Sequence, residues 1–183
     1  MCIRDRKQTA FNAQNKQTVW DIVKPLRDIG IPAVGVVDID IIKEGGSTWK
    51  KPLTGAHFPE IQHEAFGILR SKFKSTFENT NKDMKTDGGI NLLSKSDREG
   101  FQKFLDDLAE YGVFVVPHGE VENWLADIDI SRSKHSWLAG IFEAMGDNPD
   151  SDGYIYPSKG DVWDFIGNIK KWISTPNRKG IPE

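Results

Sequence analysis

Two carboxylates follow a β-branched apolar run in the segment Pro32-Ala-Val-Gly-Val-Val-Asp38-Ile-Asp40. Such a run predicts a buried strand of a parallel sheet. Residues i and i+2 of a strand project from the same face, so Asp38 and Asp40 point the same way if the strand extends that far. Neighbouring carboxylates repel each other, and a hard divalent cation relieves that repulsion. The spacing therefore predicts a metal site; the competing interpretation is a strand that ends in a solvated Asx turn.

A second apolar run is also followed by acidic residues. The segment Val113-Phe-Val-Val116 predicts another short buried strand, and Glu120 and Glu122 come soon after it. Sites in parallel sheets form at the carboxyl ends of the strands, where both acidic groups are expected to fall. We therefore expect the two glutamates to contribute to the same metal site. The alternative is that their charges only favour the N-terminus of a helix through its dipole.

A third acidic pair has the same spacing but a different context. Asp127-Ile-Asp129 follows Asn123-Trp-Leu-Ala, which is not a β-branched run. Aspartate between helical segments is ordinary capping and loop chemistry. We therefore predict a structural role for this pair.

The remaining patterns predict the elements that position these side chains. Helical periodicity covers residues 15–30, 60–80, 96–112, 137–146 and 162–173, and Ser96-Asp-Arg-Glu99 has the pattern of a capping box. Residues 41–58 contain several glycines and a proline and predict a long loop, whereas residues 81–93 are polar and uncertain. Helices that alternate with buried strands predict an α/β fold, in which helices cover a parallel sheet.

Composition excludes several classes of protein. The chain has 183 residues, 38% of them apolar, and a formal net charge of −3, which argues against a basic surface that coats nucleic acid. Its single cysteine, Cys2, excludes an internal disulfide framework. No apolar run approaches the ~20 residues needed to span a bilayer, and no signal peptide is visible. We therefore expect a cytoplasmic protein without a membrane partner.

Taken together, the segments Val-Val-Asp38-Ile-Asp40 and Val-Phe-Val-Val-Pro-His-Gly-Glu120-Val-Glu122-Asn-Trp-Leu resemble a TOPRIM domain. More narrowly, they resemble the C-terminal nuclease part of OLD-family ATP-dependent endonucleases, as does the helical segment of residues 15–32. The resemblance implies a Rossmann-like parallel sheet flanked by helices, with additional C-terminal helices. It also implies DNA as the partner and Mg²⁺ or Mn²⁺ in a two-metal site that hydrolyses phosphodiester bonds.

The resemblance also implies roles for individual residues. Asp38, Asp40, Glu120 and Glu122 would hold the metal ions, and the first three would act in catalysis. Lys159, which precedes the last helical segment, would stabilise charge on the phosphate. A solvated surface lysine is the competing interpretation of that residue. Lysines in the expected loop of residues 41–58 are candidates for contacts with the DNA backbone.

The sequence departs from the family pattern in two ways. A TOPRIM domain begins with a strand that ends in Gly-x-x-Glu, and residues 1–14 contain no glutamate; no P-loop motif of the family's ATPase occurs either. We therefore expect a truncated product that is poorly active alone, with ATP binding and homodimerisation confined to a missing upstream part. Residues 1–10 would be non-native or disordered, residues 11–128 the TOPRIM-like domain without its first strand, and residues 129–183 a helical part packed on it.

Other classes of function remain open at this point. A haloacid-dehalogenase-type phosphotransferase also uses Asp-x-Asp, although Asp-x-Asp-x-Thr is its common form and Ile41-Ile42 follows here. A glycosyltransferase would need a nucleotide-sugar site, and none can be assigned. A non-catalytic metal-binding or interaction remnant is the remaining alternative.

Overall fold

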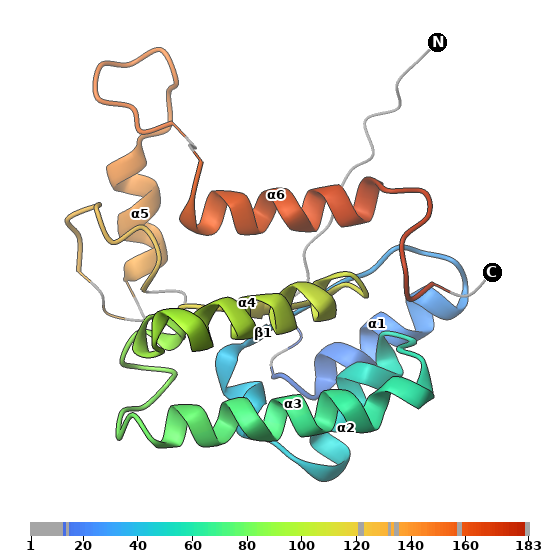
Figure 1. Cartoon of the computed structure of the whole chain (residues 1–183). Coiled ribbons are helices and arrows are strands. Elements are labelled where there is room, and N and C mark those ends of the chain that lie inside the picture. Colours follow the sequence, from blue (N-terminus) through green and yellow to red (C-terminus); the bar gives the residue numbers. More distant parts are fainter. Residues whose placement is uncertain are drawn as a thin grey trace.

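The computed structural model describes residues 13, 15–120, 123–131, 133, 136–156 and 159–181. These residues form helices around a small parallel sheet, and Figure 1 shows α3 and α6 on opposite sides of α4. In chain order the elements are α1 (Thr18–Asp28), β1 (Gly35–Asp38), the 3₁₀ helix η1 (Ile39–Lys43), α2 (Gly46–Gly55), α3 (Glu60–Glu78), the 3₁₀ helix η2 (Gly89–Leu92), α4 (Lys95–Ala109), β2 (Val113–Val116), α5 (Trp137–Met145) and α6 (Asp161–Ser174). None of the helices in these ranges is long and apolar enough to cross a membrane.

The two strands that the sequence predicted pair with each other. β1 and β2 run parallel, with Gly35 opposite Val113 and Asp38 opposite Val116. Both strands therefore end at the same edge of the sheet. The α/β class is confirmed at this level, and the helices over residues 60–80, 137–146 and 162–173 are confirmed as α3, α5 and α6.

The hydrophobic core consists of two clusters. The larger one lies between the sheet and helices α1 to α4 and is rich in aromatic side chains, among them Trp20, Trp49, Phe77, Phe101 and Phe104. The smaller one gathers the end of β2 with α5 and the following segments, and its buried members are Val116, Trp124, Trp137, Ile141 and Met145. The apolar side of α5 and the first part of α6 thus pack near the end of β2, whereas Trp172 in the last part of α6 lies near its start.

The prediction of a long loop over residues 41–58 is wrong. This segment contains the end of η1 and the whole of α2, which includes Pro52. Trp49 and Leu53 of α2 are buried in the larger core cluster, and this tertiary packing outweighs the low helix propensity of glycine and proline. Pro52 lies at the seventh position of α2 and is itself buried.

The capping box predicted at Ser96 is displaced by two residues. The N-cap of α4 is Ser94, whose Oγ accepts a hydrogen bond from the main-chain N–H of Asp97 at 3.2 Å and donates one to its carboxylate at 2.6 Å. An aspartate three residues after the cap therefore takes the place expected for glutamate in this motif. The sequence contains both Ser94-Lys-Ser-Asp97 and Ser96-Asp-Arg-Glu99. The prediction took the second segment because it ends in glutamate.

A buried arginine joins segments that are distant in the sequence. The side chain of Arg27 in α1 is fully buried, and its guanidinium group lies over the ring of Trp172 in α6. It donates hydrogen bonds to main-chain carbonyls of Ala33, Ala56, Tyr111, Gly112 and Gly180. Burial lowers the pKa of Arg27 to about 10, so the group stays charged at neutral pH. Arg27 therefore ties the C-terminal segment to α1, α2 and the start of β2.

Candidate metal site at the carboxyl edge of the sheet

The first strand ends at Asp38, and the chain then changes direction. One face of β1 is exposed at Val36, so a continued strand would expose one of the neighbouring residues Ile41 and Ile42, and both are buried, as is Ile39. The 3₁₀ helix η1 buries the side chains of all three isoleucines. Asp38 is therefore the last residue of β1, and Asp40 lies in the first turn of η1. The prediction that both carboxylates share one strand face is corrected accordingly.

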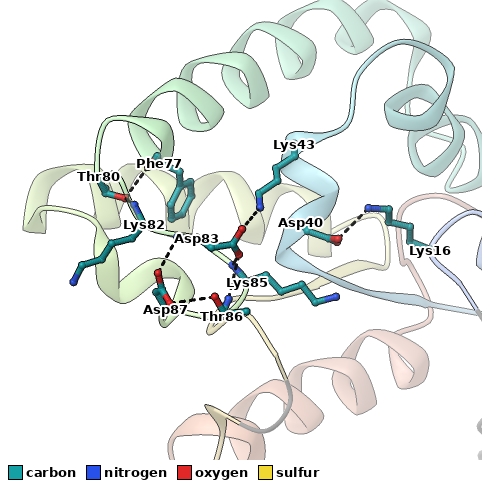
Figure 2. Close-up of polar contacts among 10 residues, drawn as sticks. All are labelled: Lys16, Asp40, Lys43, Phe77, Thr80, Lys82, Asp83, Lys85, Thr86 and Asp87. Atoms are coloured by element: carbon teal, nitrogen blue, oxygen red, sulfur yellow. Dashed lines mark hydrogen bonds and ion pairs between the residues drawn. The ribbon is translucent and has the colours of Figure 1, made fainter. Parts of the chain in front are cut away.

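The carboxylate of Asp40 is only partly satisfied. Its Oδ2 accepts a hydrogen bond from Lys16 Nζ at 3.1 Å (Figure 2). Lys16 also pairs with Glu44 at 2.6 Å. Burial lowers the pKa of Lys16, but the hydrogen bonds to Glu44 and Asp40 outweigh this effect and raise it overall. Asp40 Oδ1 is buried and has no hydrogen-bond partner among the described residues. A buried acceptor without a donor is unfavourable, so this oxygen is suited to a ligand.

The carboxylate of Asp38 is held by a lysine that the sequence did not reveal. Lys85 Nζ donates a hydrogen bond to Asp38 Oδ2 at 2.9 Å, and the side chains of Lys85 and Asp38 are 30% and 41% exposed. The hydrogen bond to Asp38 raises the pKa of Lys85, burial opposes this, and the charges of Asp38, Asp40 and Glu120 raise it further. The ammonium group of Lys85 thus contacts Asp38 and is also stabilised by the negative charges of Asp40 and Glu120.

Lys85 is positioned by a turn whose main chain is held by two aspartates. Asp83 Oδ1 accepts hydrogen bonds from the main-chain N–H groups of Lys85 at 2.7 Å and Thr86 at 3.2 Å, and Asp87 accepts one from the N–H of Asp83 at 2.9 Å. Lys43 at the end of η1 pairs with Asp83 at 2.6 Å (Figure 2). The hydrogen bond from Lys43, followed by that from the Lys85 N–H, lowers the pKa of Asp83. These contacts connect the turn to the segment that carries Asp40.

Two glycines allow this turn to approach the loop after β2. Gly89 has φ +55° and Gly119 has φ +97°, a left-handed conformation that favours glycine. A Cβ atom on Gly119 would overlap the carbonyl oxygen of Lys85, and one on Gly89 would overlap that of Pro117. The Ile90 N–H donates to the same Pro117 carbonyl at 2.8 Å. The loop that leads to Glu120 therefore lies directly against the turn that carries Lys85.

Gly119→Ala is expected to lower the free energy of unfolding by about 2–3 kcal/mol, because it combines backbone strain with a steric overlap in a packed contact. Urea unfolding followed by tryptophan fluorescence measures this loss. Gly153→Ala is the matched control, since Gly153 also has positive φ but no atom near the added methyl group. Equal losses in the two variants would contradict a close approach at Gly119.

The other predicted site residues have different outcomes. Glu120 is half-buried, and its charge acts on Lys85. Glu122 lies outside the described residues. Lys159 is placed just before Gly160, the N-cap of α6, as expected from the sequence. The lysines whose ammonium groups pair with Asp38 and Asp40 are, however, Lys85 and Lys16.

The structure also places the third acidic pair, Asp127 and Asp129, and two of the lysines of residues 41–58. Asp127 and Asp129 are both exposed, in a turn segment between β2 and α5. Lys43 pairs with Asp83, and Lys51 pairs with Asp21. These two lysines therefore support contacts within the protein, and the prediction that they contact DNA stays a prediction.

The residues present fit a hard divalent cation only in part. No group of three or more His, Cys, Asp or Glu side chains with metal-binding geometry occurs in the described part of the chain. Asp38 nevertheless ends β1, Asp40 follows in the first turn of η1, and Asp40 Oδ1 is buried without a partner among the described residues. Mg²⁺ requires only one or two carboxylates because it keeps several water ligands. The donor set is therefore compatible with Mg²⁺ or Mn²⁺.

Comparisons of the chain with protein-family models, curated proteins and solved structures find no match in any of the three. The function is consequently argued from the chemistry of the site.

Proposed function

We propose that the protein hydrolyses phosphodiester bonds of DNA with the help of Mg²⁺ or Mn²⁺ bound at Asp38 and Asp40. The finer fold that accompanies this proposal is a Rossmann-like TOPRIM domain of the OLD-endonuclease type. The observation that carries it is the buried, unpaired Oδ1 of Asp40, which follows Asp38 by two residues where β1 ends next to its parallel partner β2. Sites of α/β sheets form at the carboxyl ends of the strands.

The residues around the edge have separate roles in this proposal. Asp38 and Asp40 hold the divalent ion, and Glu120 adds a third negative charge close by. When bound, such an ion polarises the phosphate and lowers the pKa of a water ligand. Lys85 and Lys16 supply positive charge next to the carboxylates, which lessens the repulsion between the acidic edge and a DNA phosphate.

The test is nicking of supercoiled plasmid DNA by the purified protein. We expect slow conversion to the open-circular form in Mn²⁺ or Mg²⁺, because the family's Gly-x-x-Glu strand is missing from the sequence, and none in EDTA. The double variant Asp127→Asn/Asp129→Asn is the matched control, because it removes an exposed Asp-x-Asp pair and should nick like the wild type. Absence of nicking in every metal, or equal nicking after purification of an Asp40→Asn variant, would exclude this activity for the protein.

A non-catalytic metal-binding protein is the second candidate. It is favoured by the small donor set, because no group of three or more His, Cys, Asp or Glu side chains that could hold a metal occurs among the described residues, fewer than a two-metal hydrolytic site uses. This candidate predicts Mn²⁺ binding that Asp40→Asn weakens, together with intact plasmid under all conditions. The nicking assay and a binding titration therefore separate the two candidates.

A further inference from the structure

The ion pair between Lys85 and Asp38 conflicts with metal binding at the same carboxylate. Lys85 Nζ lies 2.9 Å from Asp38 Oδ2. A cation that binds Asp38 there competes with the ammonium group for the oxygen and repels it, because both are positively charged. Lysine side chains are flexible and carry a compact charge, so Lys85 can leave while its main chain stays in place.

We propose that Lys85 is a tethered counter-ion of Asp38, which a divalent cation displaces and which then binds a phosphate of the DNA. This inference rests on the proposed function of the Asp38–Asp40 edge. It assigns Lys85 the phosphate contact that the family resemblance gave to Lys159. A lysine near a reacting phosphate contributes by electrostatic stabilisation.

The contacts around the two lysines explain why Lys85, once displaced, is available to a phosphate and Lys16 is not. Lys16 bridges Asp40 and Glu44, so it keeps a carboxylate partner if it leaves Asp40. Among the described residues, Asp38 is the carboxylate with which Lys85 forms an ion pair. The main chain of Lys85 is fixed independently, through Asp83 and through its contact with Gly119. Only the side chain has to move during the exchange.

Lys85→Met tests the competition, because methionine keeps much of the length of the side chain and removes its charge. A partly exposed ion pair of this kind changes an affinity by roughly fivefold. We therefore expect Lys85→Met to bind Mn²⁺ about fivefold more tightly than the wild type in a titration followed by electron paramagnetic resonance. Lys82→Met is the matched control: Lys82 belongs to the same turn, is exposed, and points away from Asp40 in Figure 2. It should bind Mn²⁺ like the wild type.

The phosphate contact has its own readout. Fluorescence anisotropy with a labelled DNA duplex in Ca²⁺ should show weaker binding for Lys85→Met than for Lys82→Met, although both variants lose one positive charge. Equal DNA affinities of the two variants would overturn this part of the proposal.

The wild-type protein provides a test that does not depend on the folding of a variant. Acetylation of lysines by a small reagent, quantified by mass spectrometry, reports how accessible each ammonium group is. We expect Mg²⁺ to increase labelling of Lys85 several-fold and to leave Lys82 unchanged. Labelling of Lys85 that does not respond to Mg²⁺ would overturn the exchange.

Failure of the exchange and failure of the proposed function give different results. If Asp38→Asn weakens Mn²⁺ binding while Lys85→Met binds like Lys82→Met, the exchange is wrong and the metal site stands. If the wild-type protein binds no Mn²⁺, both are wrong.

Discussion

Replacing Arg27 by methionine is expected to lower the free energy of unfolding by about 4 kcal/mol. The change removes the donor from the buried carbonyl of Ala56 and from the part-buried carbonyls of Tyr111 and Gly180, and each such loss costs about 1–3 kcal/mol when water cannot replace it. It also removes the stacking of the guanidinium group on Trp172. Because whole domains are stable by only about 5–15 kcal/mol, a large share of the stability depends on this side chain. Urea unfolding monitored by circular dichroism measures the loss.

Arg178→Met is the control for this variant. Arg178 also lies over the ring of Trp172, at 5.8 Å, but it is less buried and donates to carbonyls of Trp172 and Ile173 at the nearby end of α6. We expect a loss of about 1 kcal/mol there. Similar small losses in both variants would show that Arg27 does not hold the segments together.

Asp40→Asn is expected to reduce the rate of metal-dependent plasmid nicking by at least about 100-fold. Mutation of groups that only orient metal ligands costs 10–100-fold, so loss of a ligand charge should cost no less. The same variant should keep or increase the free energy of unfolding, because it removes an ionised carboxylate whose Oδ1 is buried without a partner. Nicking rates and urea unfolding of the same preparations provide both numbers.

The combination of the two results is what identifies Asp40 as a functional residue. Replacing a carboxylate with a structural role lowers both the free energy of unfolding and the nicking rate. Replacing one with a functional role lowers the nicking rate but keeps or raises the free energy of unfolding. A drop of the unfolding free energy by several kcal/mol, with nicking in proportion to the folded fraction, would assign Asp40 a structural role.

The strands and most helices were predictable because their signals are local. Val113–Val116 forms a strand in which every residue is buried, as an unbroken β-branched and aromatic run predicts. The helix α3 spans Glu60–Glu78 as its periodicity predicts, although its buried residues are Phe73 and Phe77 and Ile61 of the same stripe is exposed. The failure over residues 41–58 has a tertiary origin, because Trp49 and Leu53 are held in a helix by the core cluster that they join.

The site was predictable only in part, for a similar reason. Asp38 and Asp40 were found from a motif, since the end of a strand is visible in the sequence. Lys85 reaches Asp38 across 47 residues of sequence, through a turn in a segment without a periodic pattern. The signal that was present is the pair of glycine-containing segments, Gly88-Gly89 and His118-Gly119, whose backbones approach closely. Glycines at such positions indicate a close backbone contact, but they do not indicate which side chain that contact brings to the candidate site.

The most direct test of the account is a Mn²⁺ titration of the wild-type protein and of the double variant Asp38→Asn/Asp40→Asn, followed by the resonance signal of the free ion. We expect the wild type to remove Mn²⁺ from solution in a saturable manner and Mg²⁺ to compete with it. The double variant should leave the free signal unchanged, while Asp127→Asn/Asp129→Asn behaves like the wild type. Equal depletion of the signal by the wild type and the Asp38→Asn/Asp40→Asn variant, or no depletion by either, would contradict a metal site at this edge of the sheet.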